Sequence, residues 1–324
     1  MIPSACLNRQ PLMVWNTSRT VKQTIIKGGE PHQVHTAGSG PYIPGVVSCL
    51  LRHGIDAMKR MTRDQLAAAL EMLYERRNRR AYVNPDPLHC VYRFTGPEDQ
   101  EIAGLIAAGL AYGRVTQIMR SLDAVFERME PSPRRWLEAQ SECNIESAFE
   151  GFQHRWTTGS ELAALLVSVR GLTNRYGTLE RAYLTHQRKT DETTIPALIG
   201  FCNELRGSGK NSLLPDPAKN AACKRLHLYL RWMVRCDAVD PGCWSSVDPA
   251  RLVVPLDTHM HRIARQLGLT RRKQANLATA LEITRAFRRI RPEDPIRYDF
   301  VLTRFGIRPE RSLPQLAAEL RQPA

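Results

Sequence analysis

The sequence predicts an all-α protein, and three observations favour this class. Aromatic residues make up only 7% of the chain and β-branched residues seldom occur in runs, which favours helix over strand. Several apolar segments follow a Ser/Thr-x-x-Glu/Gln sequence, the capping box that starts helices. No set of segments alternates apolar and polar residues as half-buried strands do.

The first 60 residues differ from the rest of the chain. The stretch 28–45 is rich in Gly, Pro and Ser and has no helical or strand periodicity. We therefore predict an irregular or disordered extension over residues 1–60 and a helical region over residues 61–324.

The first expected helices are marked by capping and breaking residues. Capping boxes at 62–65 and 95–98 open two of them, and Gly113 is placed to close the second. A third helix is predicted over 114–129, where apolar residues recur at helical spacing until Pro131.

Further helices are expected along the rest of the chain. A capping box at 158–161 opens the fourth, and a long amphipathic helix is predicted over 218–235, after a segment rich in Gly and Pro. Shorter helices are expected over 178–186, 195–205, 258–267, 274–290, 295–305 and 312–321.

The net charge favours an anionic partner. The chain carries a formal charge of +14, and from Lys219 to Ala324 it has 20 Lys/Arg against 10 Asp/Glu. Such an excess indicates nucleic acid first and an anionic membrane second, the alternative being a merely solvated surface. No apolar run reaches the length of a membrane span, and no signal peptide is evident. We expect DNA as the partner, no membrane partner, a monomer and a cytoplasmic, nucleoid-associated location.

The cysteines do not predict a metal centre. The eight cysteines include no Cys-x-x-Cys pair, so their spacing is not that of a zinc site, and reduced thiols are the simplest account. We expect no metal and no cofactor.

The densest candidate site lies at Asp257, where the apolar run 252–256 ends and a helix is expected to begin. One interpretation is structural, because Asp is a preferred N-cap residue. The other is chemical, because a fixed and partly dry carboxylate suits acid–base work or stabilisation of a developing positive charge. The two interpretations are compatible.

The string Asp-Thr-His-Met-His also suggests a metal site. Asp257, His259 and His261 are all potential ligands, but two histidines separated by two positions on a helix point in different directions. A metal-dependent hydrolase that uses these histidines is therefore the least favoured alternative.

The segment LDTHMHRIARQLGL (256–269) resembles the part of the endonuclease III-like, helix-hairpin-helix DNA glycosylases that holds their catalytic aspartate. Longer strings, among them NPDPLHCVYRF and YDFVLTRFGI, resemble the DUF2400 family of the same superfamily over residues 64–310. The resemblance implies a two-lobed helical bundle with an active-site cleft between the lobes, and catalysis by Asp257. No cysteine follows Cys243, so the iron–sulfur cluster of many members is not expected.

The resemblance also makes Lys224 a candidate nucleophile. Bifunctional members attack the sugar C1′ with a lysine of a Pro-Gly-x-Gly-x-Lys hairpin, which this chain lacks. Lys224, 33 residues before Asp257, is placed similarly to the lysine of archaeal 8-oxoguanine glycosylases. An apolar helix face and the adjacent Arg225 favour a free amine there. The alternative is a lysine that snorkels or binds phosphate.

Other side chains are candidates for binding. The expected phosphate contacts are Lys210, Lys219, Arg225, His259 and Arg262. The candidates for stacking on an extruded base are Phe152, His154, Trp156 and Trp232, although each is equally suited to anchor a loop or fill a core. Tyr112, Arg114 and Gln117 either reach the cleft or cap the second helix.

Three functions follow from these observations. The first is a DNA base-excision glycosylase, with or without Schiff-base lyase activity, acting on a damaged or modified base. The second is a DNA- or RNA-binding protein that keeps the fold without the chemistry, which the absent hairpin favours. The third is the metal-dependent hydrolase.

Overall fold

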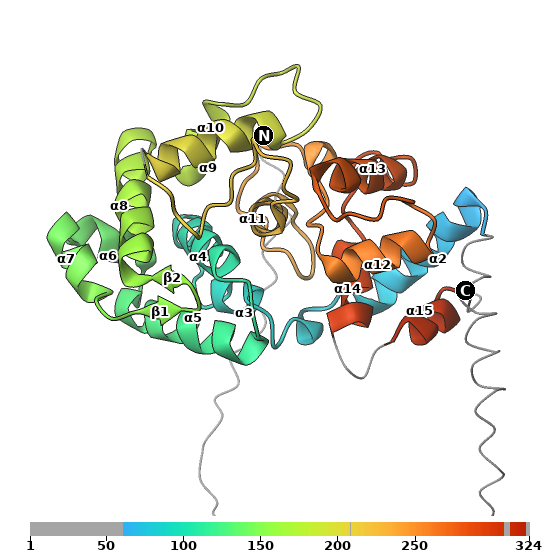
Figure 1. Cartoon of the computed structure of the whole chain (residues 1–324), viewed down its shortest axis with the longest axis horizontal. Coiled ribbons are helices and arrows are strands. Elements are labelled where there is room, and N and C mark those ends of the chain that lie inside the picture. The colour runs from blue at the N-terminus through green and yellow to red at the C-terminus, as the bar shows by residue number, and fades with distance from the viewer. Residues whose placement is uncertain (1–60, 208, 308–311, 322–324) are drawn as a thin grey trace, which may run out of the picture. The chain divides into compact units, whose positions relative to one another are not determined.

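Helices account for most of the residues that the computed structural model describes, which are 61–207, 209–307 and 312–321 (Figure 1). Within these ranges there are fourteen α-helices and one sheet of two very short strands, so the predicted all-α class is confirmed. The extension predicted over residues 1–60 lies outside the described residues. No helix in the described ranges combines the length and apolarity that a membrane crossing requires.

The helices before the central helix α11 are α2 (Arg63–Arg77), α3 (Leu88–Val91), α4 (Pro97–Gly109), α5 (Val115–Met129), α6 (Pro133–Ala139), α7 (Glu142–Ala148), α8 (Gly159–Tyr176), α9 (Leu179–Leu184) and α10 (Ile195–Arg206). The later ones are α11 (Lys224–Val234), α12 (Thr258–Gln266), α13 (Leu277–Arg288), α14 (Asp299–Ile307) and α15 (Leu313–Glu319). Strands β1 (Gln153–His154) and β2 (Thr157–Thr158) pair antiparallel between α7 and α8. The 3₁₀ turns are η1 (Arg80–Tyr82) and η2 (Pro249–Arg251).

Two of the three predicted capping boxes are confirmed, those at 62–65 and 158–161. The box predicted at 95–98 is wrong, because Pro97 occupies the first helical position and makes Gly96 the N-cap. Helix α4 then ends at Gly109, so Gly113, at φ +98°, lies beyond it in the following turn.

The long helix predicted over 218–235 is shorter than expected. Helix α11 begins at Lys224, and the residue before it, Cys223, has a left-handed φ of +42°. The side chain of Asp216 accepts a hydrogen bond from the backbone N–H of Ala218 at 3.0 Å. This bond closes a turn over residues 216–218, between Pro215 and the start of the predicted helix. This local turn competes with helix, and it makes Lys224 the first residue of α11. The short helices α3, α6 and α7 were not predicted.

Helices α4 and α11 pack closely at the centre of the fold. Residues 101–109 of α4 are all buried. A Cβ atom at Gly104 would come within 2.6 Å of Met233 Cε on α11, so glycine allows the two helices to approach. Beside them, α12 packs against α14, where a Cβ at Gly306 would lie 2.7 Å from His259 Cβ. The first contact holds the C-terminal end of α11 against α4, and the second holds the first turn of α12 against α14.

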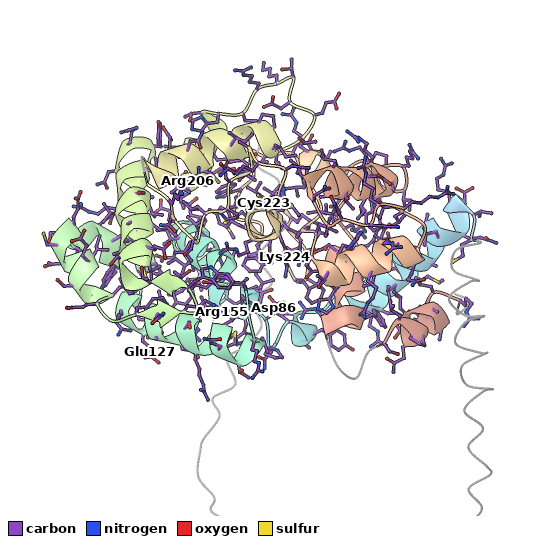
Figure 2. The ribbon with its side chains drawn as sticks, viewed as in Figure 1. Asp86, Glu127, Arg155, Arg206, Cys223 and Lys224 are labelled. Carbon is purple, nitrogen blue, oxygen red and sulfur yellow. The ribbon has the colours of Figure 1, made fainter. Side chains whose placement is uncertain are left out.

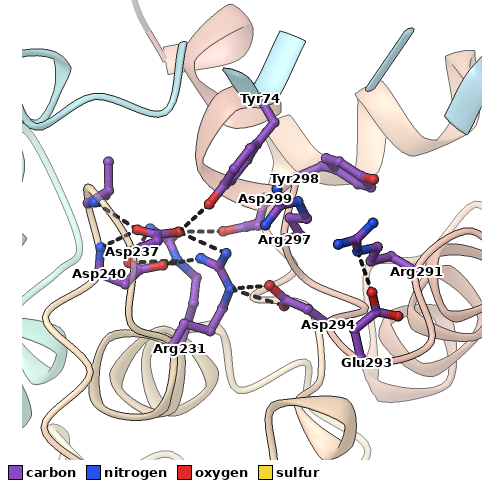
Figure 3. A network of polar contacts seen from close by, with 12 residues as sticks. Tyr74, Arg231, Asp237, Asp240, Arg291, Glu293, Asp294, Arg297, Tyr298 and Asp299 are labelled. Carbon is purple, nitrogen blue, oxygen red and sulfur yellow. Dashed lines mark hydrogen bonds and ion pairs between the residues drawn. The ribbon is translucent and has the colours of Figure 1, made fainter. Parts of the chain in front are cut away.

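A buried ionic network joins α11 to the segments around it (Figure 3). Arg231 donates to Asp240 at 2.8 Å and to Asp299 at 2.7 Å. Arg235, one helical turn later, pairs with Asp240 and with Asp294, the latter at 3.0 Å. The two arginine side chains are only 4% and 3% exposed. Paired in this way the charges are tolerated, but loss of one partner would leave the other buried and uncompensated.

A second buried carboxylate, Glu101, holds the start of α9. It accepts hydrogen bonds from the backbone N–H groups of Leu179 at 2.8 Å and Glu180 at 3.1 Å, and from Trp244 Nε1 at 2.9 Å. Burial opposes its ionisation more strongly than these donors favour it, and raises the pKa of Glu101 to about 7.

We expect Glu101→Ala to lower the free energy of unfolding by about 3 kcal/mol, because three buried donors lose their acceptor. Glu138→Ala is the control, since that side chain is 46% exposed in an ion pair with Arg134 and its loss costs less than about 0.5 kcal/mol. Urea unfolding measures both.

Because the folded pKa of Glu101 lies above the ordinary value of 4.5, wild type loses stability relative to Glu101→Gln as pH rises from 4.5 to about 7. Equal costs at positions 101 and 138, or a pH-independent difference, would contradict this account.

Candidate active site

The starts of α11 and α12 bring together the two residues that the sequence singled out. Lys224 Nζ lies 3.1 Å from Asp257 Oδ2, although the residues are far apart in sequence. Figure 2 labels Lys224 between the ribbons that Figure 1 labels α11 and α12. The structure therefore places the candidate amine and the candidate carboxylate in direct contact.

Asp257 is an N-cap residue, and its carboxylate is also fixed and partly dry. Its Oδ1 accepts a hydrogen bond from the backbone N–H of Met260 at 2.8 Å, so it is the N-cap of α12. Its other oxygen, Oδ2, meets Lys224. The preceding residues Leu252, Val253, Val254 and Leu256 are all buried, and the side chain of Asp257 is 15% exposed. The cap thus fixes the carboxylate without occupying the oxygen that faces the lysine.

Lys224 is held less tightly. Its side chain is 34% exposed, and its ion pair with Asp257 is the contact that defines its position. A cation at the first turn of a helix lies at the positive end of the helix dipole, an unfavourable position that the carboxylate offsets. The amine therefore remains open to a ligand while its nearest charged neighbour is a proton acceptor.

A cavity of about 380 Å³ opens beside this pair, and we call it the central cavity. Its charged lining residues besides the pair are Asp86, Arg231, Asp299 and Arg304. Its apolar and aromatic lining includes Tyr112, Val115, Ile118, Leu228 and Trp232. Apolar walls with a few convergent polar groups, at this size, are typical of pockets for small ligands.

The charged residues of the central cavity are arranged in pairs. Arg304 bonds to Asp86, and Arg231 donates to Asp299 at 2.7 Å. Burial raises the pKa of Asp299 to about 6 despite the arginine, and the nearby carboxylate of Asp257 raises it further. Burial also opposes ionisation of Asp86, but there the Arg304 guanidinium outweighs it and holds the pKa below its usual value.

Only one of the four predicted base-stacking residues lines the central cavity, namely Trp232. His154 is fully buried, where Nε2 donates to the Tyr112 carbonyl at 3.0 Å and Nδ1 then accepts from the Ser121 hydroxyl at 2.8 Å. Phe152 packs edge-on against Phe149, in a different hollow. These two residues anchor the β1–β2 hairpin, which was the structural alternative.

Trp156 lies at the rim of the central cavity. Its ring stacks on Tyr112, which lines the cavity, at 4.6 Å between centroids and 18° between planes. The Arg155 guanidinium lies over the Trp156 ring, 4.7 Å from its centroid. Trp156 is 58% exposed, and it and Val115 are the large hydrophobic side chains exposed within the described ranges. Both exposed apolar side chains therefore belong to the cavity or its rim.

The predicted phosphate-binding residues divide into three groups. Arg225 is committed to the fold, since its guanidinium donates to the carbonyls of Gly109 and Ser212 and lies 4.9 Å from the Tyr112 ring centroid. His259 lines the central cavity and packs on Gly306. The exposed members of the set are Lys210, Lys219 and Arg262, of which Lys219 pairs with Asp216 at 3.9 Å.

The ligands of the metal alternative are not assembled. His261 donates to the Arg272 carbonyl at 2.9 Å, while His259 faces the central cavity. Among the described residues, no group of three or more His, Cys, Asp or Glu side chains lies close enough together to hold a metal ion. The Asp-Thr-His-Met-His string that suggested a metal-dependent hydrolase therefore does not form a metal site within the described part of the chain.

Sequence reasoning did not single out Asp86, Asp299 or Arg304. Asp86 sits in the string NPDPLHCVYRF and the other two in YDFVLTRFGI. The sequence feature that could have indicated them is a charged residue within an apolar segment, because a charge is seldom buried unless it is paired. The partner of each charge lies on another element, so its place in the site required the folded chain.

We expect Asp257→Ala to cost about 1 kcal/mol of stability, because the Met260 N–H loses its acceptor, and Asp257→Asn to cost less than about 0.5 kcal/mol, because Asn is an equally good N-cap. Asn276→Ala is the matched control, since Asn276 caps α13 by accepting from Thr279 N at 3.1 Å with no lysine in the contact. Thermal unfolding measures all three. If Asp257→Asn lowers stability as much as Asp257→Ala, the charge of Asp257 stabilises the fold and its role as N-cap does not.

The comparisons with known proteins identify a family. Residues 86–308 match the family described as "Protein of unknown function (DUF2400)", and this range is more than half of the chain and contains Lys224, Asp257 and the whole charged lining of the central cavity. Neither the curated proteins nor the solved structures include a significant match. The chain therefore belongs to the DUF2400 family.

Proposed function

We propose that this protein is a DNA base-excision glycosylase that acts on a damaged or modified base and has Schiff-base lyase activity. The observation that carries the proposal is the 3.1 Å contact between Lys224 Nζ and Asp257 Oδ2 at the central cavity. An amine next to a carboxylate, both fixed at helix starts, is the arrangement that covalent catalysis by lysine needs.

The proposed reaction uses each group of the pair. Asp257 Oδ2 accepts a proton from the Lys224 ammonium, and the free amine attacks the sugar C1′. The N-glycosidic bond breaks, and its electron pair leaves with the base, which takes up a proton. The C1′–O4′ bond then opens, O4′ is protonated, and the amine nitrogen loses its remaining excess proton to give the C1′ imine. Removal of a C2′ proton expels the 3′ phosphate by elimination.

The central cavity suits the substrate that this chemistry requires. A base inside a duplex is inaccessible, so it must rotate out of the stack into a protein pocket. The cavity has a volume of about 380 Å³ and an apolar wall that includes Trp232 and Leu228. At its rim, the exposed Trp156 offers an aromatic face to a neighbouring base.

The surface beside the site supports a phosphate backbone as the ligand. Arg262 and Arg265 of α12 are exposed and line a shallow hollow together with Thr258 and His261. Helix α12 thus carries Asp257 at its start and two cations on its open face. This arrangement, together with the overall charge of +14, supports chromosomal DNA as the partner.

A second function has one observation in its favour. In a DNA- or RNA-binding protein without catalytic activity, the Lys224–Asp257 contact is simply an ion pair that keeps the lysine protonated, and a protonated amine is no nucleophile. The absence of the Pro-Gly-x-Gly-x-Lys hairpin agrees with this alternative. The trapping experiment below distinguishes it from the glycosylase.

Borohydride trapping tests the chemistry. We expect wild type to form a covalent adduct with duplexes that carry an abasic site or the correct modified base, because borohydride reduces the imine to a stable amine. The adduct should be lost in Lys224→Ala and reduced at least about 100-fold in Asp257→Asn. Lys189→Ala is the matched control, an exposed lysine that is not among the expected phosphate contacts.

Each other outcome has a definite meaning. Base release that depends on Asp257 but gives no adduct indicates a glycosylase without the lyase step and removes Lys224 as the nucleophile. Neither adduct nor base release on any duplex, with DNA binding intact, supports the non-catalytic alternative.

Salt dependence tests the binding surface. We expect Arg262→Ala and Arg265→Ala each to reduce the slope of log Kd against log salt concentration by about 1, because each removes one phosphate contact. Arg63→Ala, at the start of helix α2 and outside the hollow that Arg262 and Arg265 line, has a side chain 67% exposed and should leave the slope unchanged. Fluorescence anisotropy with a short duplex measures the slopes, and equal effects of all three substitutions would argue against α12 as the phosphate-binding helix.

A further inference from the structure

We propose that Asp299 and Trp232 form the part of the central cavity that recognises the polar edge of a nucleobase, with Asp299 accepting from a base N–H and Trp232 donating to an adjacent base acceptor. The inference rests on the proposed function and adds to it the two residues that select the substrate and the hydrogen-bonding pattern they select.

The first observation is an unsatisfied carboxylate oxygen. Asp299 lines the central cavity and is 3% exposed. Its Oδ2 accepts from Arg231 at 2.7 Å, but its Oδ1 is buried without a hydrogen-bond partner. An unpaired carboxylate oxygen in a protein interior is costly, so it calls for a ligand atom or a water.

The second observation is an unsatisfied donor on the same cavity. Trp232, fully buried on α11, also lines the central cavity, and its Nε1–H has no partner. A third lining residue, Arg304, is 4% exposed and has an unpaired Nε. Buried tryptophan and arginine nitrogens usually find acceptors. Three unsatisfied groups on one cavity therefore indicate a built polar surface rather than three separate defects.

The third observation is that Asp299 is held rigidly. Its partner Arg231 is shared with Asp240, and Asp240 is shared with Arg235, so the carboxylate is the end of the buried network drawn in Figure 3. Precise hydrogen-bond recognition needs side chains whose positions are fixed by further contacts. The network supplies these contacts, and it leaves Oδ1 of Asp299 without a hydrogen-bond partner.

The pattern of groups defines the ligand. A carboxylate oxygen accepts from an N–H, and the indole and guanidinium N–H groups donate to a carbonyl oxygen or ring nitrogen. The ligand is thus a planar heterocycle with an N–H donor next to an acceptor, as on the pairing edge of an intact or oxidised base. A base whose edge has been blocked by alkylation leaves these buried groups unpaired and is rejected.

The test compares substrates that contain or lack the base. Duplexes carrying a single uracil, hypoxanthine or 8-oxoguanine report base release, and a duplex with an abasic site reports adduct formation without any base. We expect Asp299→Asn to reduce the ratio of base-release rate to abasic-site trapping rate at least about tenfold, because the amide presents a donor where the base has an N–H. Trp232→Phe, which lacks the indole N–H, should reduce the same ratio.

Controls separate recognition from folding and from general catalysis. Asp294→Asn changes another carboxylate of the same network, one that does not line the central cavity, and should leave the ratio unchanged. Asn at 299 retains an acceptor for Arg231, and thermal unfolding verifies the fold of each variant. An unchanged ratio in Asp299→Asn, or an equal fall in both rates, overturns the inference. Absence of both reactions in wild type overturns instead the proposed function on which it rests.

Discussion

The buried pairing of Arg231 with Asp240 and Asp299 is the interaction on which the rest of this site depends. Arg231 of α11 and Arg235, its C-cap, lie in the interior, where removal from water is costly, and only a full set of carboxylate partners makes their burial tolerable. Those partners come from the segment after α11 and from α14, so the pairing fixes both against the helix. Because Lys224 begins the same helix and Asp299 begins α14, the network determines how the cavity is lined.

The Lys224–Asp257 pair depends on a different principle, the requirement that helix ends be capped. Asp257 uses one oxygen to satisfy a backbone N–H of α12 and keeps the other for Lys224. The first residue of α11 meets the N-cap residue of α12, while α11 packs closely on α4 at Gly104 and α12 packs closely on α14 at Gly306. A structural role for Asp257 is therefore what makes a chemical role possible.

The central cavity combines groups that are seldom found together without a ligand. Its wall includes aromatic and aliphatic side chains, while Asp299, Trp232 and Arg304 each present a polar atom with no partner. An apolar cavity alone would bind many small molecules, whereas fixed and unsatisfied donors and acceptors select among them. The exposed Trp156, stacked on Tyr112 at the rim, extends the aromatic surface toward solvent. A flat, polar-edged ligand that enters from a larger polymer fits all of these features.

Much of this arrangement was determined by the sequence itself. The capping boxes at 62–65 and 158–161 and the N-cap role of Asp257 involve bonds between residues three apart, so short segments specify them. The start of α11 was mispredicted, because a turn around Asp216 competes with helix over a segment whose composition allows both. Only the tertiary structure decided the contact of Lys224 with Asp257 and the place of Asp299 beside them. Lys224 and Asp257 are 33 positions apart, and Asp299 is 68 positions from its partner Arg231. No local pattern determines which of these charges meet.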